Sequence, residues 1–173
     1  MGHIFYVMGK SASGKDTIYK ILRERLPQIR TVVPYTTRPI RAGEQDGVQY
    51  YFTDDSRLEE FKKSGKLIEA RAYHTVHGIW TYFTADDGQV DLSEGNYLGI
   101  GTLESYQKLK QYYGEEHVIP VYIEVEDGER LQRALLRERE QEKPKYEEMC
   151  RRFLADAEDF SEENLKRAGI VRS

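Results

Sequence analysis

A glycine-rich segment near the start of the chain has the residue types that hold phosphate groups. It consists of Gly9, Lys10, Ser11, Ala12, Ser13, Gly14, Lys15, Asp16 and Thr17. Glycines let backbone N–H groups approach phosphate oxygens, and the first turn of a following helix favours an anion. A lysine at this position neutralises the β- and γ-phosphates during phosphoryl transfer. The segment therefore predicts an ATP site in which Lys15 is catalytic.

Asp16 stands where the usual form of this pattern has serine or threonine, whose hydroxyl group ligates Mg²⁺. A carboxylate is also a hard oxygen ligand, so we expect Asp16 to hold the Mg²⁺ that accompanies ATP. A glycine-rich turn that binds no ligand is the competing interpretation. The segment lies directly after an apolar run and opens a helical pattern, which favours phosphate binding.

A second group of anion-binding residues follows in the polar segment 35–52. Arg38 and Arg41 are three residues apart, Pro39 stiffens the chain between them, and Tyr50 lies downstream. Two guanidinium forks and a phenol hydroxyl suit a single phosphate monoester. Taken alone, the same arginines could lie on the surface of a hairpin.

The order of residues in this segment is specific to one family. From Thr36 the chain reads T-T-R-P-I-R-A-G-E-Q-D-G-V-Q-Y-Y-F. This resembles the nucleoside-monophosphate-binding segment of guanylate kinases, at that family's distance from the phosphate loop, and the resemblance covers nearly the whole chain. It implies that Thr36, Arg38, Arg41 and Tyr50 bind GMP, and that the imidazole of His77 replaces a phosphate-binding hydroxyl.

By the same resemblance, Glu69 matches the carboxylate that reads the guanine base. Guanine presents two adjacent donors, N1–H and the 2-amino group, which one carboxylate accepts together. Adenine lacks that pair, so Glu69 would select GMP over AMP. Without the motif upstream, a glutamate at this place is more often a solvated charge.

The chain departs from the family pattern at several positions of the expected acceptor site. Pro34 stands where the family has a small hydroxyl residue, and residues 77–79 read H-G-I instead of Tyr-Gly-Thr/Ser. Residues 98–101 read L-G-I-G where the family has L-D-I-D, so both carboxylates are missing. Two alternatives therefore stay open: a guanylate-kinase-like binding module that has lost turnover, and a kinase of another phosphomonoester.

A third group of arginines lies on the charged helical pattern after residue 126. Arg133 and Arg137 are four residues apart and share one helix face. In guanylate kinases R-L-x-x-R at this place reaches over the transferring phosphate, so the resemblance implies catalytic roles for Arg133, Arg137 and the later Arg152. Arg130, Arg139 and Arg151 compete for these roles. A salt-bridged, solvated helix is the alternative for at least half of these charges.

The elements that must position these residues follow from periodicity and turn signals. Strands are expected at 3–8, 29–33, 67–84, 96–100 and 118–125, and helices at 18–26, 103–112 and from 127 to about 165 with a break at Lys143-Pro144. Residues 35–52 look like hairpins. Ser56-x-x-Glu59 predicts a capping box that opens a short helix ending at Gly65. Alternating strands and helices predict a parallel sheet.

The expected fold is α/β: a P-loop three-layer α/β/α domain with a parallel sheet, a small, mostly β GMP-binding lobe and a helical lid. Residues 1–173 form a single guanylate-kinase-like domain. Its core is 1–33, 85–126 and 151–173, the lobe is 34–84, and the lid is 127–150. Residues 169–173 begin a further strand of the family, so adenine contacts stay unassigned.

Composition excludes other classes of protein. The net charge is −4, from 26 Lys and Arg against 30 Asp and Glu, which argues against a nucleic-acid binder. The longest apolar run, 4–8, is far shorter than the roughly 18 residues of a membrane span, and no signal peptide precedes it. We therefore expect a cytoplasmic protein with no membrane partner, and a single cysteine, Cys150, that is inert.

Together these features predict a guanylate kinase that converts ATP and GMP to ADP and GDP with Mg²⁺. No general base is required, because the second pKa of the acceptor phosphate is near ~6 and its oxygen is already anionic at neutral pH.

Overall fold

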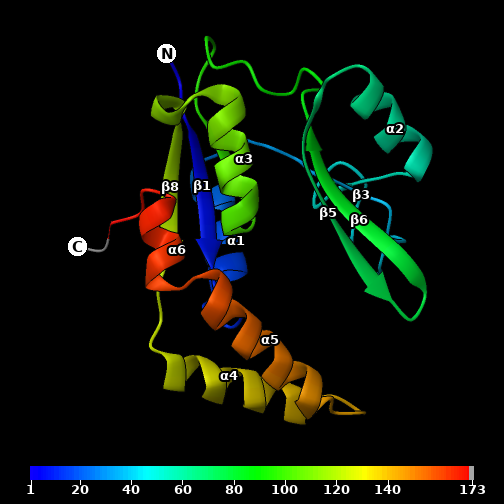
Figure 1. Ribbon diagram of the computed structural model, residues 1–173, viewed down its shortest axis with the longest axis vertical. Helices are drawn as coiled ribbons and strands as arrows, with labels where there is room; N and C mark the ends of the chain where they lie inside the picture. The colour runs from blue at the N-terminus through cyan, green and yellow to red at the C-terminus, as the bar shows by residue number, and fades with distance from the viewer. Residues whose placement is uncertain (172–173) are drawn as a thin grey trace.

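The computed structural model describes residues 1–171, and its larger part is built on a four-stranded parallel sheet (Figure 1). The strand order is β2-β7-β1-β8. The bounds are Ile4–Gly9 for β1, Arg30–Thr31 for β2, Tyr97–Ile100 for β7 and Val118–Ile123 for β8. Nearly every residue of β1 is buried, as is typical of a central strand in a parallel sheet that is covered on both faces.

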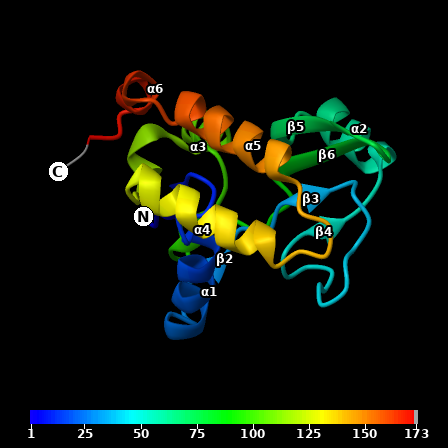
Figure 2. The same cartoon turned by 90° about the horizontal axis from the view of Figure 1, so that it is seen from below.

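Helices cover both faces of this sheet, so the predicted three-layer arrangement is confirmed (Figure 2). α3, Leu103–Tyr113, and α6, Glu162–Arg167, lie on one face, and α1, Lys15–Arg25, lies on the other. Alternate residues of a strand point to opposite faces. The even-numbered residues of β1 from Ile4 to Met8 accordingly join one buried cluster with apolar side chains of α3 and α6.

The smaller sheet holds the residues of the expected lobe. Its order is β4-β3-β6-β5, with β3 at Tyr35–Thr36, β4 at Tyr51–Phe52, β5 at Leu67–Thr75 and β6 at Gly78–Ala85. β5 and β6 pair as an antiparallel hairpin, and they cover residues 67–84, which the sequence predicts to be extended. α2, Asp55–Lys63, packs on this sheet, and together they bury a small aromatic core that includes Phe61 and Phe83.

The expectation of hairpins in 35–52 is wrong, because β3 and β4 run parallel. The chain between them, 37–50, folds back on itself and brings both strands to the same end of the sheet. Glycines at positions 43 and 47 with positive φ allow the reversals, and a buried ion pair between Arg38 and Glu44 holds the loop. A parallel pair needs such a crossover, whereas a tight turn would have given antiparallel strands.

The last third of the described chain is helical. α4, Asp127–Arg139, and α5, Tyr146–Asp159, lie beyond the carboxyl ends of the parallel strands (Figure 1). The break between them confirms the one predicted at Lys143-Pro144. Residues 169–171 are not in a strand, contrary to expectation, and the rest of that predicted strand lies outside the described residues. Within residues 1–171, no helix is both long and apolar enough to cross a membrane.

α2 begins two residues earlier than the sequence suggests, because Asp54 and not Ser56 is its N-cap. The Asp54 carboxylate accepts a hydrogen bond from the backbone N–H of Arg57 at 3.0 Å. Ser56 lies inside the first turn, so the predicted capping box is wrong. An aspartate was available two residues upstream, and its charge also suits the positive end of the helix dipole.

Asp54→Ala is therefore expected to lower the free energy of unfolding by about 1 kcal/mol, because one backbone N–H loses its acceptor. Ser56→Ala is the matched control and should change stability by less than about 0.5 kcal/mol. Urea denaturation of the two variants measures both values. A larger loss for Ser56→Ala would restore the capping box.

Candidate active site

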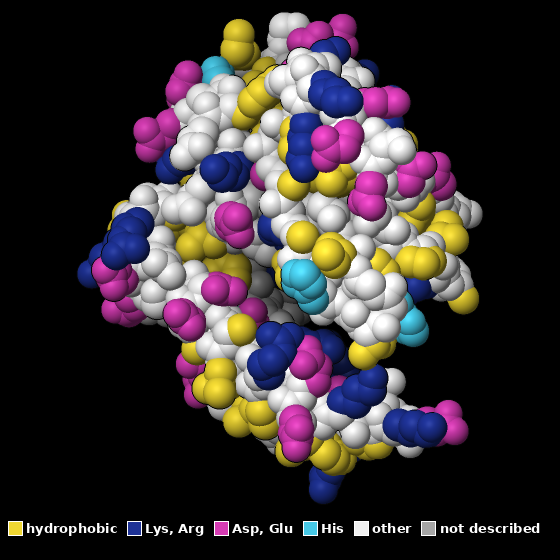
Figure 3. Space-filling view, turned by 45° about the vertical axis from the view of Figure 1, so that its right-hand side comes forward, with side chains coloured by type: hydrophobic (Ala, Val, Ile, Leu, Met, Phe, Trp, Pro, Cys, Tyr) yellow, Lys and Arg dark blue, Asp and Glu magenta, His cyan; other side chains and the backbone are white. Residues whose placement is uncertain are grey.

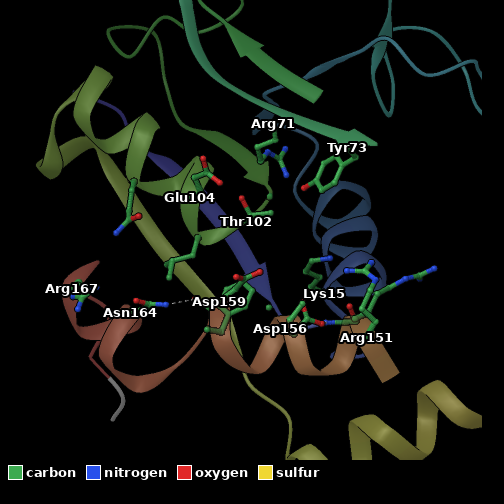
Figure 4. Close-up of a pocket in the computed structure, with 18 residues that line it drawn as sticks. Lys15, Arg71, Tyr73, Thr102, Glu104, Arg151, Asp156, Asp159, Asn164 and Arg167 are labelled. Carbon is green, nitrogen blue, oxygen red and sulfur yellow. Dashed lines mark hydrogen bonds between the residues drawn. The ribbon is translucent and has the colours of Figure 1, made fainter. Parts of the chain in front are cut away.

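A cavity of about 690 Å³ opens where the carboxyl ends of β1 and β7 face β5 and α5. Figure 3 shows a hollow in the surface of the molecule on the side that it presents. Five parts of the chain contribute to its wall (Figure 4). They are Gly9, Ser11 and Lys15 of the phosphate loop, Arg71 and Tyr73 of β5, Thr102 and Glu104 near the start of α3, Arg151, Arg152, Asp156 and Asp159 of α5, and Asn164 and Arg167 of α6. Five arginine and lysine side chains and three carboxylates therefore surround one space, where Arg167 is the fifth cation.

The phosphate loop has the backbone shape that an anion cradle requires. Gly14 has a φ of 86° and Ala12 a φ of 60°, so both residues are in the left-handed region. A Cβ on Gly9 would come within 2.7 Å of Ser13 Oγ, so only glycine fits there. The Ser13 hydroxyl is buried and has no hydrogen-bond partner within residues 1–171. The two left-handed residues and the tight packing at Gly9 give the segment the compact turn typical of a phosphate-binding loop at the start of a helix.

Lys15 begins α1 and lines the cavity, with about a quarter of its side chain exposed. Its Nζ lies 3.5 Å from a carboxylate oxygen of Asp16, whose side chain is 85% exposed. Thr17 and Lys10 point elsewhere: Thr17 is exposed on the helix, and Lys10 Nζ lies 3.4 Å from Asp127. Of this segment's charged side chains, Lys15 is the one that faces the space between the two sheets.

α4 and α5 both form hydrogen bonds to Ser11 of the phosphate loop. The Ser11 backbone N–H donates to Asp156 at 2.8 Å, and its carbonyl accepts from Arg130 at 3.0 Å. Arg130 is 1% exposed, donates also to Asp127 at 2.9 Å, and lies 4.6 Å over the ring of Phe153. Sequence reasoning named Arg130 only as a competitor and missed Asp156, for which nothing in the local pattern gives a signal.

The other arginines of this region separate into two groups. Arg137 and Arg152 line a smaller cavity of about 60 Å³ beside Ser11 and Ala12, and Arg152 lines the larger one as well. Arg133 instead pairs with Glu129 on the exposed side of α4 and lines neither cavity. All three expected catalytic arginines are exposed, and two of them, Arg137 and Arg152, line a cavity beside the phosphate loop.

In the smaller sheet, Arg38 is the most deeply buried of the expected phosphate ligands. It is 5% exposed and forms a two-pronged ion pair with Glu44 at 2.8 and 2.7 Å. This pair raises the pKa of Arg38 and lowers the pKa of Glu44 to about 2, with the hydrogen bond between them as the main cause of both. Arg38 also lies 5.3 Å over the ring of Tyr50, while Arg41 is exposed.

Thr36 and His77 are placed differently from the expected ligands around them. The Thr36 hydroxyl is fully buried, donates to the Thr81 carbonyl at 3.1 Å and accepts from the Arg38 backbone N–H at 3.2 Å. It therefore shapes the loop that carries Arg38. His77 lies exposed in the turn between β5 and β6, stacked on Trp80, and does not line the cavity.

Glu69 is 5% exposed on β5, between the two sheets. Thr84 donates to one carboxylate oxygen at 2.8 Å, and Arg71 Nε donates to the other at 3.2 Å. Arg71 continues into the wall of the cavity. Sequence reasoning placed Glu69 but missed Arg71, although the two-residue spacing on a strand puts both side chains on one face.

Tyr6 explains why Gly99 and Gly101 stand on β7 and just after it. The Tyr6 ring crosses over both residues: a Cβ on Gly99 would lie 2.8 Å from its Cδ1, and a Cβ on Gly101 would overlap its hydroxyl. That hydroxyl forms a 2.7 Å hydrogen bond with Ser105 of α3. Burial raises the pKa of Tyr6, and the Glu69 charge adds to the effect. A phenol from β1 therefore occupies the space that side chains at 99 and 101 would need.

The chain is similar to guanylate kinases over most of its length. The profile of the family described as guanylate kinase matches residues 2–163. A guanylate kinase from Mycobacterium bovis is 40% identical over 78 residues, which are 45% of this chain and 36% of that enzyme. One from Thermobifida fusca is 46% identical over 61 residues, 35% of this chain and 31% of that enzyme. The aligned segments thus span about a third of the length of these curated relatives.

The fold is similar to a solved structure as well. The crystal structure of guanylate kinase from Anaplasma phagocytophilum matches with a TM-score of 0.58 and 20% sequence identity, over 99% of this chain and 97% of that chain. At this identity, the likeness concerns the fold.

Gly101→Ala is expected to lower the free energy of unfolding by about 1–3 kcal/mol, because the added methyl group meets Tyr6 and lies 2.6 Å from Ser105 Oγ. Gly95→Ala is the matched control, since a Cβ there meets no atom within 4 Å. Chemical denaturation of both variants gives the difference. Equal stabilities would show that Tyr6 does not occupy the space beside Gly101.

Proposed function

Because the chain belongs to the guanylate kinase family, we propose that it transfers the γ-phosphoryl group of ATP to GMP and yields ADP and GDP. The observation that carries the proposal is one cavity that joins Lys15 of the phosphate loop to the β5 face on which Glu69 and Arg71 lie. A donor held by the loop and an acceptor held by the smaller sheet would meet in that space. The ends of the parallel strands are where such folds bind nucleotides.

The reaction needs positioning and charge neutralisation from the protein. At neutral pH the acceptor phosphate is largely dianionic, so its oxygen attacks without a general base. Lys15 and backbone N–H groups of the phosphate loop would hold the phosphates of ATP in line with the attacking oxygen of GMP. Arg137 and Arg152, beside Ser11 and Ala12, would offset the charge that spreads over the transferred group.

The residues around the phosphate loop fit a Mg²⁺ ion that arrives with ATP. Asp16 offers an exposed carboxylate beside Lys15. Within residues 1–171, no three acidic, histidine or cysteine side chains gather as a metal site. One protein carboxylate with phosphate oxygens and water suffices for Mg²⁺. Asp16 would hold the ion, which would supply positive charge to offset that of the phosphates.

Residues 127–150 are proposed to act as a lid. They carry α4 and the start of α5, which contact the phosphate loop through Arg130. A bound nucleotide that orders the loop would therefore also order the helices that hold Arg137 and Arg152. Closure over the cavity would exclude water and suppress hydrolysis of ATP.

The loss of carboxylates at 99 and 101 would favour a binding module only if the base site had collapsed. Instead, Tyr6 occupies the space beside Gly99 and Gly101. The chain also retains Lys15 and the whole phosphate loop, which a binding module does not need. A coupled assay with ATP against GMP, AMP, CMP and UMP tests the proposal. Turnover with GMP above the others supports it, and turnover with none contradicts it.

Lys15→Ala should lower kcat by at least about 100-fold while the unfolding midpoint stays near that of the parent, because within residues 1–171 the ion pair of Lys15 is with exposed Asp16. Lys20→Ala, on the exposed side of the same helix, is the control and should retain activity. Near-parental turnover of Lys15→Ala would remove the phosphate loop from the mechanism.

Glu69→Gln should reduce kcat/KM for GMP by roughly 30- to 1000-fold, because an amide accepts one guanine donor and opposes the other. AMP, which does not use this contact, should be unaffected or improve, so the ratio of GMP to AMP is the measured quantity. Glu59→Gln on the surface of α2 is the control. An unchanged ratio would mean that Glu69 does not read the base.

A further inference from the structure

Arg71 lies next to Glu69 in a position to contact the same ligand. The two residues alternate on β5, opposite Tyr82 and Thr84 of β6, so their side chains share one face of the sheet. Arg71 has 18% of its side chain exposed and lines the cavity, whereas the Glu69 carboxylate lies behind it with 2% exposed. Figure 4 shows the Arg71 guanidinium directed from β5 into the cavity, near Thr102.

The pair offers donors and acceptors side by side. A guanidinium has five N–H donors, and the one on Nε is used by Glu69 at 3.2 Å. Its two terminal nitrogens remain in the cavity wall as a planar fork. A carboxylate has about four acceptor positions, of which Thr84 and Arg71 each take one. Both groups can therefore bind a ligand while they hold each other in place.

Guanine presents the complementary pattern along two adjoining edges. N1–H and the 2-amino group are donors, and O6 and N7, which come next around the ring, are acceptors. A guanidinium fork pairs with O6 and N7 through two hydrogen bonds. Resting on the proposed function, we propose that Arg71 is a second specificity-determining residue of the acceptor site, donating to O6 and N7 of guanine while Glu69 accepts from N1–H and the 2-amino group.

With Arg71 in this role, base selection does not depend on the hydroxyl at position 79 and the carboxylate at position 101 that the family pattern has and this chain lacks. Ile79 and Gly101 bring no polar side-chain atom to the base, and Tyr6 fills the space at Gly101. Adenine keeps the N7 acceptor but has an amino group at position 6, which would face one donor of Arg71 and leave that donor unpaired. Arg71 thus rejects AMP by a contact independent of Glu69.

The unmodified protein tests the inference with an altered substrate. In 7-deaza-GMP a C–H group replaces N7, which removes one of the two acceptors and leaves the Glu69 edge intact. We expect kcat/KM for 7-deaza-GMP to be about tenfold below that for GMP. Equal values for the two substrates would overturn the proposal, and no variant needs to fold for this result.

Two variants then assign the effect to Arg71. Arg71→Lys keeps the positive charge beside Glu69 but loses the fork, and Arg71→Met removes the donors altogether. Both should lose roughly 5- to 150-fold in kcat/KM for GMP, and in Arg71→Met the ratio of GMP to 7-deaza-GMP should fall to about one. Arg57→Lys, on exposed α2, is the control and should keep the parental ratio.

A residue that only positioned Glu69 would lower activity on both substrates and leave their ratio unchanged, which would also overturn the proposal. Calorimetric binding of GMP and 7-deaza-GMP separates this inference from the proposed function. Binding of GMP about tenfold tighter than 7-deaza-GMP, without turnover, would refute the kinase activity and retain the role of Arg71. Turnover of GMP together with equal binding of GMP and 7-deaza-GMP would support the kinase activity and refute the role of Arg71.

Discussion

The buried guanidinium of Arg130 joins the helical end of the chain to the phosphate loop. A buried charge is costly unless it is paired and hydrogen-bonded, and here the Ser11 carbonyl, the Asp127 carboxylate and the Phe153 ring surround it. This requirement determines which side of α4 faces the phosphate loop and which side of α5 faces Arg130. Asp156 completes the attachment by accepting the Ser11 N–H. The shape of the loop and the placement of both helices therefore depend on one another.

The proposed acceptor site lies where β1, α3 and β5 come close to one another. Tyr6 passes over two glycines and reaches Ser105, and on the opposite side Glu69 is held by Thr84 and Arg71. Hydroxyl and charged groups are thus gathered where the two sheets approach each other. Tyr6 of β1 is bonded to Ser105 of α3, and Glu69 of β5 is bonded to Thr84 of β6. The distance between the two sheets therefore sets the size of the proposed acceptor site. A kinase needs this spacing to bring acceptor and donor into line.

Much of the fold followed from local patterns, and the errors have local causes too. Apolar runs predicted the four strands of the main sheet, and helical spacing predicted α1, α3 and the charged helices. The sequence offered two candidate caps for α2, and periodicity could not choose between Asp54 and Ser56. Residues 35–52 look like hairpins because their glycines and Pro39 are typical turn residues. In the structure the Arg38–Glu44 ion pair holds the loop within this segment, and β3 and β4 run parallel.

A phosphate loop and the importance of Arg38 and Glu69 could be predicted from the sequence alone, because these predictions depend on consecutive residues or on a short motif with fixed spacing. Only the tertiary structure decided which arginines reach that loop: residues three and four apart on one helix look equivalent until packing buries one of them, and Arg130 contacts Ser11 across a separation of 119 residues. It also revealed Tyr6 over Gly99 and Gly101 and placed Arg71 in the cavity wall. Such contacts depend on how distant elements pack, and a single sequence carries no local signal for them.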